Sequence, residues 1–172
     1  VWDENSTWTR SETEHGTYVP TAEAPTASNS ASVTIISGAS VTVLSDVSID
    51  QATIDSGGQV IIATGGTLTI VDDGTSAVDL SVTGTLTESG GVLATGTDSI
   101  VLYNGVNQTI VTAEYDELQL SGSGTKTFSG TTTATGGITV NSNVTVTGST
   151  LIASDTIIQA AADVNSATSR VF

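Results

Sequence analysis

One short pattern recurs along the chain and restricts how the chain can fold. Residues 37–43 (SGASVTV), 56–62 (SGGQVII) and 64–70 (TGGTLTI) share a small residue, a glycine, two spacers and an alternating apolar stretch. The first two copies lie 19 residues apart, and the TLT of residues 67–69 returns 18 residues later at 85–87. A repeat of about 20 residues is the length of one solenoid coil made of short strands and turns.

The segments between the turns have the composition and alternation of β-strands. Thr, Ser, Gly, Val, Ile and Ala dominate and aromatic residues make up only 4%, a mixture that favours pleated strands over helices. Short strands are expected at residues 33–35, 41–43, 47–49, 68–70, 100–102, 118–120, 126–128, 138–140 and 144–146. We predict an all-β, single-domain parallel β-helix, because the expected strands are shorter than those of a β-sandwich, which usually run to about five or six residues. A sandwich completed by a donated N-terminal strand is the alternative.

The two ends of the chain differ from its body. Residues 1–32 hold both tryptophans, both prolines and the only histidine, so we expect an extended N-terminal arm or cap. Residues 33–158 have room for roughly six coils of the repeat, and residues 159–172 are expected to form a C-terminal segment or cap. Both ends need covering, since a terminal coil exposes unpaired backbone groups and apolar core.

The middle of the chain resembles a known repeat. Residues 104–110 (NGVNQTI) and 115–128 (YDELQLSGSGTKTF) run as a polar glycine turn, QTI, a Y-x-x-L-x-L strand and GSGTKT. This order is similar to the repeat of secreted β-helical surface and adhesin-type proteins of bacteria, notably Bacteroidetes. Residues 5–8 (NSTW), with Pro20 downstream, are similar to the entry segment of such helices. The resemblance implies a coil and an extracellular or cell-surface location, and it implies no activity.

The charge of the chain excludes two classes of partner. Eighteen acidic residues face only three basic ones, for a formal net charge of -15. Such a chain repels the phosphates of nucleic acids and anionic lipid head groups. No run of about 18 apolar residues occurs either, so we expect no membrane insertion.

Few residues in the chain can carry out chemistry. His15 is the only histidine and cysteine is absent, so no metal or nucleophile constellation can form around that side chain. Paired carboxylates occur at residues 72–73 and 116–117. A glycosidase needs two facing carboxylates, usually with aromatic and basic residues beside them, and the body has no Trp and only Lys126 as a cation before Arg170. We predict that the protein is not an enzyme.

No cofactor or dedicated metal site is expected. Asp72 and Asp73 before Gly74, and Asp46 with Asp50, supply oxygen ligands suited to Ca²⁺. Neither an EF-hand loop nor the calcium-binding nonapeptide is present. We therefore expect adventitious Ca²⁺ binding at most.

A plain repetitive body with an aromatic arm and no chemistry is typical of a structural protein. If the ends of identical copies pair head to tail, the contact does not close and the product is a filament. We predict a self-associating subunit of an extracellular filament or stalk. The residues expected to mediate its assembly are Trp2, Trp8, Tyr18, Val171 and Phe172.

Two other functions stay open at this point. An adhesin that binds a surface glycan predicts an aromatic patch on one side of the coils, for which Tyr103, Tyr115 and Phe128 are the candidates. An ice-binding solenoid predicts ranks of outward Thr-x-Thr pairs, found at residues 67–69, 85–87, 125–127 and 145–147 but at unequal spacings.

The sequence also contains acceptor patterns for N-glycosylation. They begin at Asn5, Asn107 and Asn143. Modification is expected only in a host that has that pathway.

Overall fold

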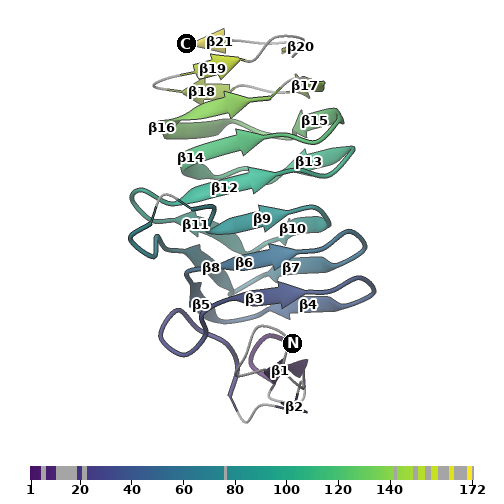
Figure 1. Cartoon of the computed structure of the whole chain (residues 1–172), viewed down its shortest axis with the longest axis vertical. Coiled ribbons are helices and arrows are strands. Elements are labelled where there is room, and N and C mark those ends of the chain that lie inside the picture. The colour runs from purple at the N-terminus through teal and green to yellow at the C-terminus, as the bar shows by residue number, and fades with distance from the viewer. Residues whose placement is uncertain are drawn as a thin grey trace.

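The computed structural model describes residues 1–4, 7–10, 19–20, 23–75, 77–141, 143–148, 151–153, 156–158, 163–164 and 170–171. The chain winds into a rod of about six stacked coils (Figure 1), in which each strand pairs in parallel with its counterpart one coil away. The predicted parallel β-helix is confirmed. The β-sandwich alternative is wrong, because the described residues contain only one antiparallel ladder, between β1 (Thr9–Arg10) and β2 (Val19–Pro20) in the arm.

The lower coils, which span β3 to β11, have a triangular plan with one strand on each of three faces. The long sheet begins with β3 (Val33–Ile35), β6 (Ala52–Ile54) and β9 (Leu80–Val82). The lower second sheet is β4 (Ser40–Val43), β7 (Gln59–Ala63) and β10 (Thr85–Ser89). The third sheet is β5 (Asp46–Ile49), β8 (Thr67–Ile70) and β11 (Val92–Thr95).

The upper coils, from β12 onward, keep the long sheet and build a new second sheet. The long sheet continues through β12 (Ile100–Tyr103), β14 (Glu114–Leu120), β16 (Thr132–Val140), β18 (Leu151–Ala153) and β21 (Arg170–Val171), with β19 (Thr156–Ile158) also on β16. The upper second sheet is β13 (Gln108–Ile110), β15 (Gly124–Phe128), β17 (Val144–Gly148) and β20 (Asp163–Val164). Strand pairing therefore extends past residue 158 to β20 and β21.

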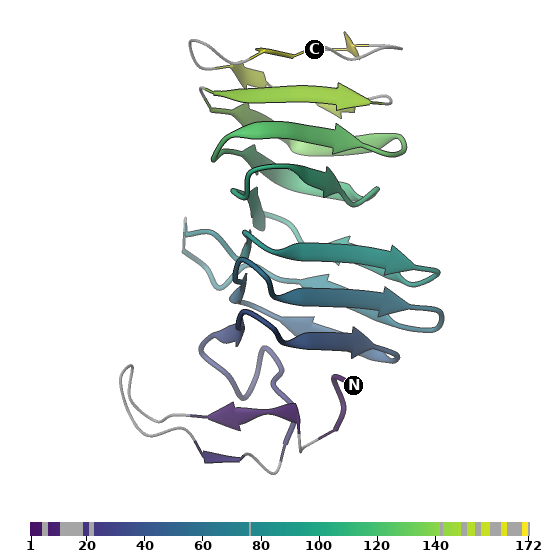
Figure 2. The ribbon, with the colours of Figure 1, turned by 90° about the vertical axis from the view of Figure 1, so that its right-hand side faces the viewer.

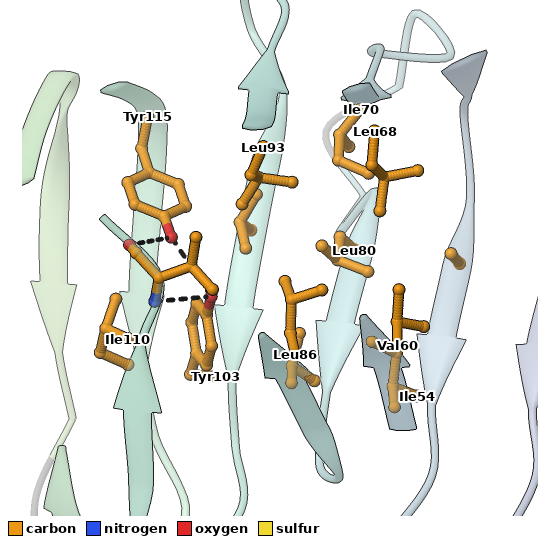
Figure 3. Close-up of a cluster of buried hydrophobic side chains, with 14 of the residues drawn as sticks. Ile54, Val60, Leu68, Ile70, Leu80, Leu86, Leu93, Tyr103, Ile110 and Tyr115 are labelled. Carbon is orange, nitrogen blue, oxygen red and sulfur yellow. Dashed lines mark hydrogen bonds between the residues drawn. The ribbon is translucent and has the colours of Figure 1, made fainter. Parts of the chain in front are cut away.

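The core is a narrow column of aliphatic side chains inside the coils (Figure 3). Val41, Val60 and Leu86 occupy the same position of β4, β7 and β10, and all three are buried. On each strand, the residues that alternate with these inward positions face outward, as the alternation in the sequence predicts. Burying one such side chain stabilises the fold by about 1.5–3 kcal/mol, so the column supplies much of the force that holds the coils in register.

Glycines at the turns allow the coils to approach closely. Gly38 and Gly57 take the same left-handed conformation, with φ of 81° and 83°, one coil apart. At the next position, a Cβ added to Gly58 would lie 2.5 Å from the carbonyl oxygen of Ile35. The glycine doublet in the repeated pattern thus combines a left-handed turn with a close backbone contact.

The N-terminal arm packs on the first coil and covers its lower end at β4 and β5. Trp2 is 1% exposed, and its backbone amide donates to the carbonyl of Thr42 on β4 at 2.7 Å. The Trp2 indole donates to Pro25 O at 3.0 Å, and the Trp8 indole donates to Trp2 O at 2.7 Å. The two rings are 4.8 Å apart and tilted by 59°. These contacts satisfy polar groups that the end of a solenoid would otherwise leave unpaired.

Replacing the central ring of this cap should open the lower end of the rod. We expect Trp2→Ala to lower the free energy of unfolding by about 3–5 kcal/mol, measured by urea denaturation. Amide exchange should accelerate at Val41 and Val43 while Val146, in the upper coils, stays protected. Trp2→Phe, which keeps a ring but loses the indole hydrogen bond, should cost only about 1 kcal/mol. Equal effects of the two variants would contradict the capping role.

Candidate functional site

A groove opens where the second sheet is interrupted. β10 is the last strand of the lower second sheet and β13 the first of the upper one, and the two do not pair. Figure 2 shows this break facing the viewer, and between the two strands lies a hollow of about 440 Å³. Leu86 and Glu88 line the groove from β10, and Thr109 and Ile110 line it from β13. It therefore presents two unpaired strand edges above and below one opening.

Two buried tyrosines lie behind this break (Figure 3), and Tyr103 lines the groove itself. The hydroxyls of Tyr103 and Tyr115 lie 3.2 Å apart, and Tyr115 also donates to the carbonyl of Val111 at 2.8 Å. Burial raises the pKa of Tyr103 to about 12 and raises that of Tyr115 well above its ordinary value. Both side chains are therefore neutral at physiological pH, and they hold the short corner that connects β13 to β14.

A ladder of polar side chains links the coils at the neighbouring corner. The amide nitrogen of Gln108 donates to Val82 O at 2.8 Å and to Gly84 O at 3.2 Å, in the coil below. The Gln108 side-chain oxygen accepts a hydrogen bond from the backbone amide of Gly105 in its own coil, at 2.8 Å. It also accepts one from the Lys126 ammonium in the coil above, at 2.8 Å. Lys126 also donates to Gly105 O. One glutamine thus bridges three consecutive coils.

Lys126 in this ladder is fully buried without a carboxylate partner in the described residues. Desolvation lowers its pKa from 10.5 to about 8. Gln108 and Lys126 belong to the QTI and TKT motifs of the repeat, so the structure assigns both motifs a role in joining coils. No lysine or arginine among the described side chains is exposed, and the described surface therefore carries acidic groups with little to balance them.

The aromatic candidates for glycan binding are not on the surface. Tyr103 and Tyr115 are 0% exposed and Phe128 is 2% exposed. All three point into the core because they occupy inward positions of β12, β14 and β15. The expected aromatic patch is therefore absent from the described surface of the coils.

The threonine pairs do not form a single flat face. Residues 67–69 lie on the third sheet, 85–87 on the lower second sheet, and 125–127 and 145–147 on the upper second sheet. Only the last two pairs are neighbours, with Thr127 and Thr147 hydroxyls 3.3 Å apart.

The assembly and glycosylation candidates are distributed over the molecule. Trp2 and Trp8 are buried in the cap, and Val171 belongs to β21. Asn107 and Asn143 are exposed in turns. Tyr18, Phe172, Asn5 and His15 lie outside the described residues.

The predicted carboxylate pairs behave differently from one another. Asp46 opens β5 and Asp50 follows its last residue, so at about 3.3 Å per residue they lie too far apart to share an ion. The carboxylate of Asp116 accepts a hydrogen bond from the backbone amide of Asp98 at 2.7 Å and so stabilises the turn that contains Asp98. Asp72 and Asp73, by contrast, meet a third carboxylate, that of Asp79.

Few ionisable side chains line the described part of the groove. Among the described residues Glu88 is the only carboxylate that lines it, and its Oε1 accepts the backbone amide of Leu93 at 2.7 Å. The other polar groups along the groove are hydroxyls, side-chain amides and the free edges of β10 and β13. The free edges of β10 and β13 present backbone groups with which another strand can pair.

No protein-family model matches the chain, and comparisons with curated proteins and with solved structures found no significant match. The resemblance to bacterial surface repeats therefore stays a prediction.

The buried lysine should give the protein a distinctive alkaline profile. The unfolded chain holds the Lys126 proton up to about pH 10.5 and the folded chain only to about pH 8. Unfolding therefore takes up a proton between these values, and we expect stability to rise from pH 8 toward pH 10. Above pH 10 the buried tyrosines reverse the trend, because the unfolded chain releases their protons first.

Urea denaturation at several pH values checks this expectation. In Lys126→Met the rise between pH 8 and 10 should disappear, whereas Thr145→Val, on the adjacent strand, should keep the wild-type profile. Parallel profiles for wild type and Lys126→Met would show that the ammonium is not desolvated in the fold.

Proposed function

We propose that this protein is a non-enzymatic structural unit of an extracellular filament or stalk, and that identical copies associate end to end. The observation that carries the proposal is the long sheet, whose parallel ladder runs from β3 to β21. In the described residues each of these terminal strands pairs on one side only. A second copy placed at the end of the first can continue this sheet from β21 to β3.

The N-terminal cap leaves this route open. Trp2 covers β4 through Thr42, and the amide of Ala27 covers β5 by donating to Ser48 O at 2.7 Å. Among the described residues no comparable backbone bond reaches the outer edge of β3. The edge of a β-strand is a ready template for another strand. This geometry supports an assembly in which the cap covers β4 and β5 and leaves the edge of β3 accessible. Trp2 and Trp8 then keep their contacts within their own chain.

Charge sets the condition under which copies can meet. Each copy carries a formal charge of -15, so copies repel one another at low ionic strength. The described residues contain no helix long and apolar enough to cross a membrane. The location outside the cell rests on the repeat resemblance, and the end-to-end contact rests on the strand edges.

The glycan-binding alternative is less well supported, because its aromatic candidates are buried. The ice-binding alternative is less well supported because its threonine pairs are spread over separate sheets.

End-to-end association should strengthen with salt. We expect sedimentation velocity to show larger species at about 0.5 M NaCl than at about 20 mM, because the screening length falls several-fold over this range. Negative-stain images should show particles that grow in length at constant width. Monomers at every salt concentration, or particles that grow in width, would contradict the proposal.

A blocked end provides the matched control. A compact folded domain fused directly after Phe172 should stop growth, because β21 can then no longer reach β3 of the next copy. The same domain added unfused to the wild-type chain should leave growth unchanged.

A further inference from the structure

The corner between β8 and β9 carries the longest loop among the equivalent corners of the lower coils. The connection occupies residues 71–79, whereas the same corner takes only residues 50–51 one coil below and 96–99 one coil above. The loop projects from the side of the rod (Figure 1). An insertion at one corner needs its own stabilising contacts, because it has no counterpart to stack on.

Three carboxylates from the two ends of this loop converge. Asp72 and Asp73 follow β8 and Asp79 precedes β9, and oxygen atoms of the three side chains all lie within 4.8 Å of one another. No lysine, arginine or histidine among the described residues forms an ion pair with them. Three negative charges this close need a counter-charge or a proton.

Asp79 provides an observation that is independent of this clustering. The residue is 0% exposed, and its Oδ2 accepts the backbone amide of Ile100 at 2.7 Å. Its Oδ1 is buried and has no hydrogen-bond partner, and Oδ1 of Asp72 is in the same state. Buried carboxylate oxygens without a donor are rare in folded proteins and call for a partner. Both orphan oxygens belong to the same cluster.

Neighbouring coils hold the carboxylates in place. Gln51, one coil below, donates to Oδ2 of Asp73 at 2.7 Å, and the Thr75 hydroxyl and amide donate to its Oδ1 at 2.6 and 2.9 Å. These bonds lower the pKa of Asp73 and keep it ionised. Burial, and then the charges of Asp72 and Asp73, raise the pKa of Asp79. The ionised form of Asp79 is thus disfavoured unless a cation is present.

We propose that Asp72, Asp73 and Asp79 form a Ca²⁺ site that joins the two ends of the 71–79 loop. All three ligands are hard oxygen donors, which Ca²⁺ and Mg²⁺ prefer and Zn²⁺ does not require. Ca²⁺ accepts irregular coordination, whereas Mg²⁺ demands a nearly ideal octahedron. Asp73 is exposed, so water can complete the coordination on the outer side. The site acts on stability and is independent of end-to-end assembly.

Calorimetric titration of the chelator-treated full chain with Ca²⁺ tests the site. In about 0.15 M NaCl, which suppresses diffuse binding to an acidic surface, we expect one site with a Kd between about 10⁻⁵ and 10⁻³ M. The thermal midpoint should rise with Ca²⁺ and respond more weakly to Mg²⁺. Ca²⁺ should also slow amide exchange in residues 71–79.

Variants separate this site from general charge effects. Asp79→Asn should abolish both the heat of binding and the Ca²⁺-dependent midpoint shift, and should raise the midpoint without Ca²⁺ because a repelling charge is removed. If that variant does not fold, Asp73→Asn at the exposed ligand should weaken Ca²⁺ binding at least about tenfold. Asp46→Asn removes the same charge elsewhere and should bind like wild type.

Three outcomes would overturn the proposal. Absence of binding in wild type is one. Weak binding of several ions that Asp79→Asn leaves unchanged would mean an adventitious ion only. An equal loss in Asp46→Asn and Asp79→Asn would show that overall charge, rather than the cluster, attracts the ion. Assembly measured in chelator keeps this result separate from the test of end-to-end association.

Discussion

The structure depends on one constraint, the parallel register in which each coil lies over the one before it. Because the backbone of one coil pairs with the next, short strands that would be unstable alone gain partners on both sides. The same register places valine over valine in the core, as for Val41 and Val60, and places glycine over glycine at the turns. A coil that shifted by one residue would turn its apolar side chains to solvent.

Because the faces of the rod are taken up by this stacking, polar interactions collect at its corners. Gln108 and Lys126 join coils at one corner, and the carboxylates around Asp79 gather at another. In both places side chains bond to side-chain or backbone groups of the coils above and below, so these contacts depend on the alignment of three successive coils. The groove beside β10 also follows from how the coils are built. It lies where the coils change from three sheets to two, because the third sheet ends at β11.

Much of the fold could be predicted from the sequence, because alternation and repeat length are local signals. Alternation also placed Lys126 in line with inward residues of its strand, but a lysine is so rarely buried that its position in the core was not expected. Asp79 could not have been found in this way, since it lies in a loop without periodicity and meets Asp72 only when the two ends of that loop come together. The tyrosine pair required knowledge of the register shift between Tyr115 and Glu117.

The interruption between β10 and β13 gives the rod a mechanical asymmetry. At that level the backbone ladder between lower and upper coils runs through the long sheet, where β9 pairs with β12, while on the side of the groove the described coils are joined by side-chain bonds such as those of Gln108. Because one backbone ladder is missing there, we expect a force that bends the rod toward or away from the open face to meet less resistance than at a fully paired coil. We therefore expect the rod to behave as two stiffer segments that meet at this level and bend in one preferred plane.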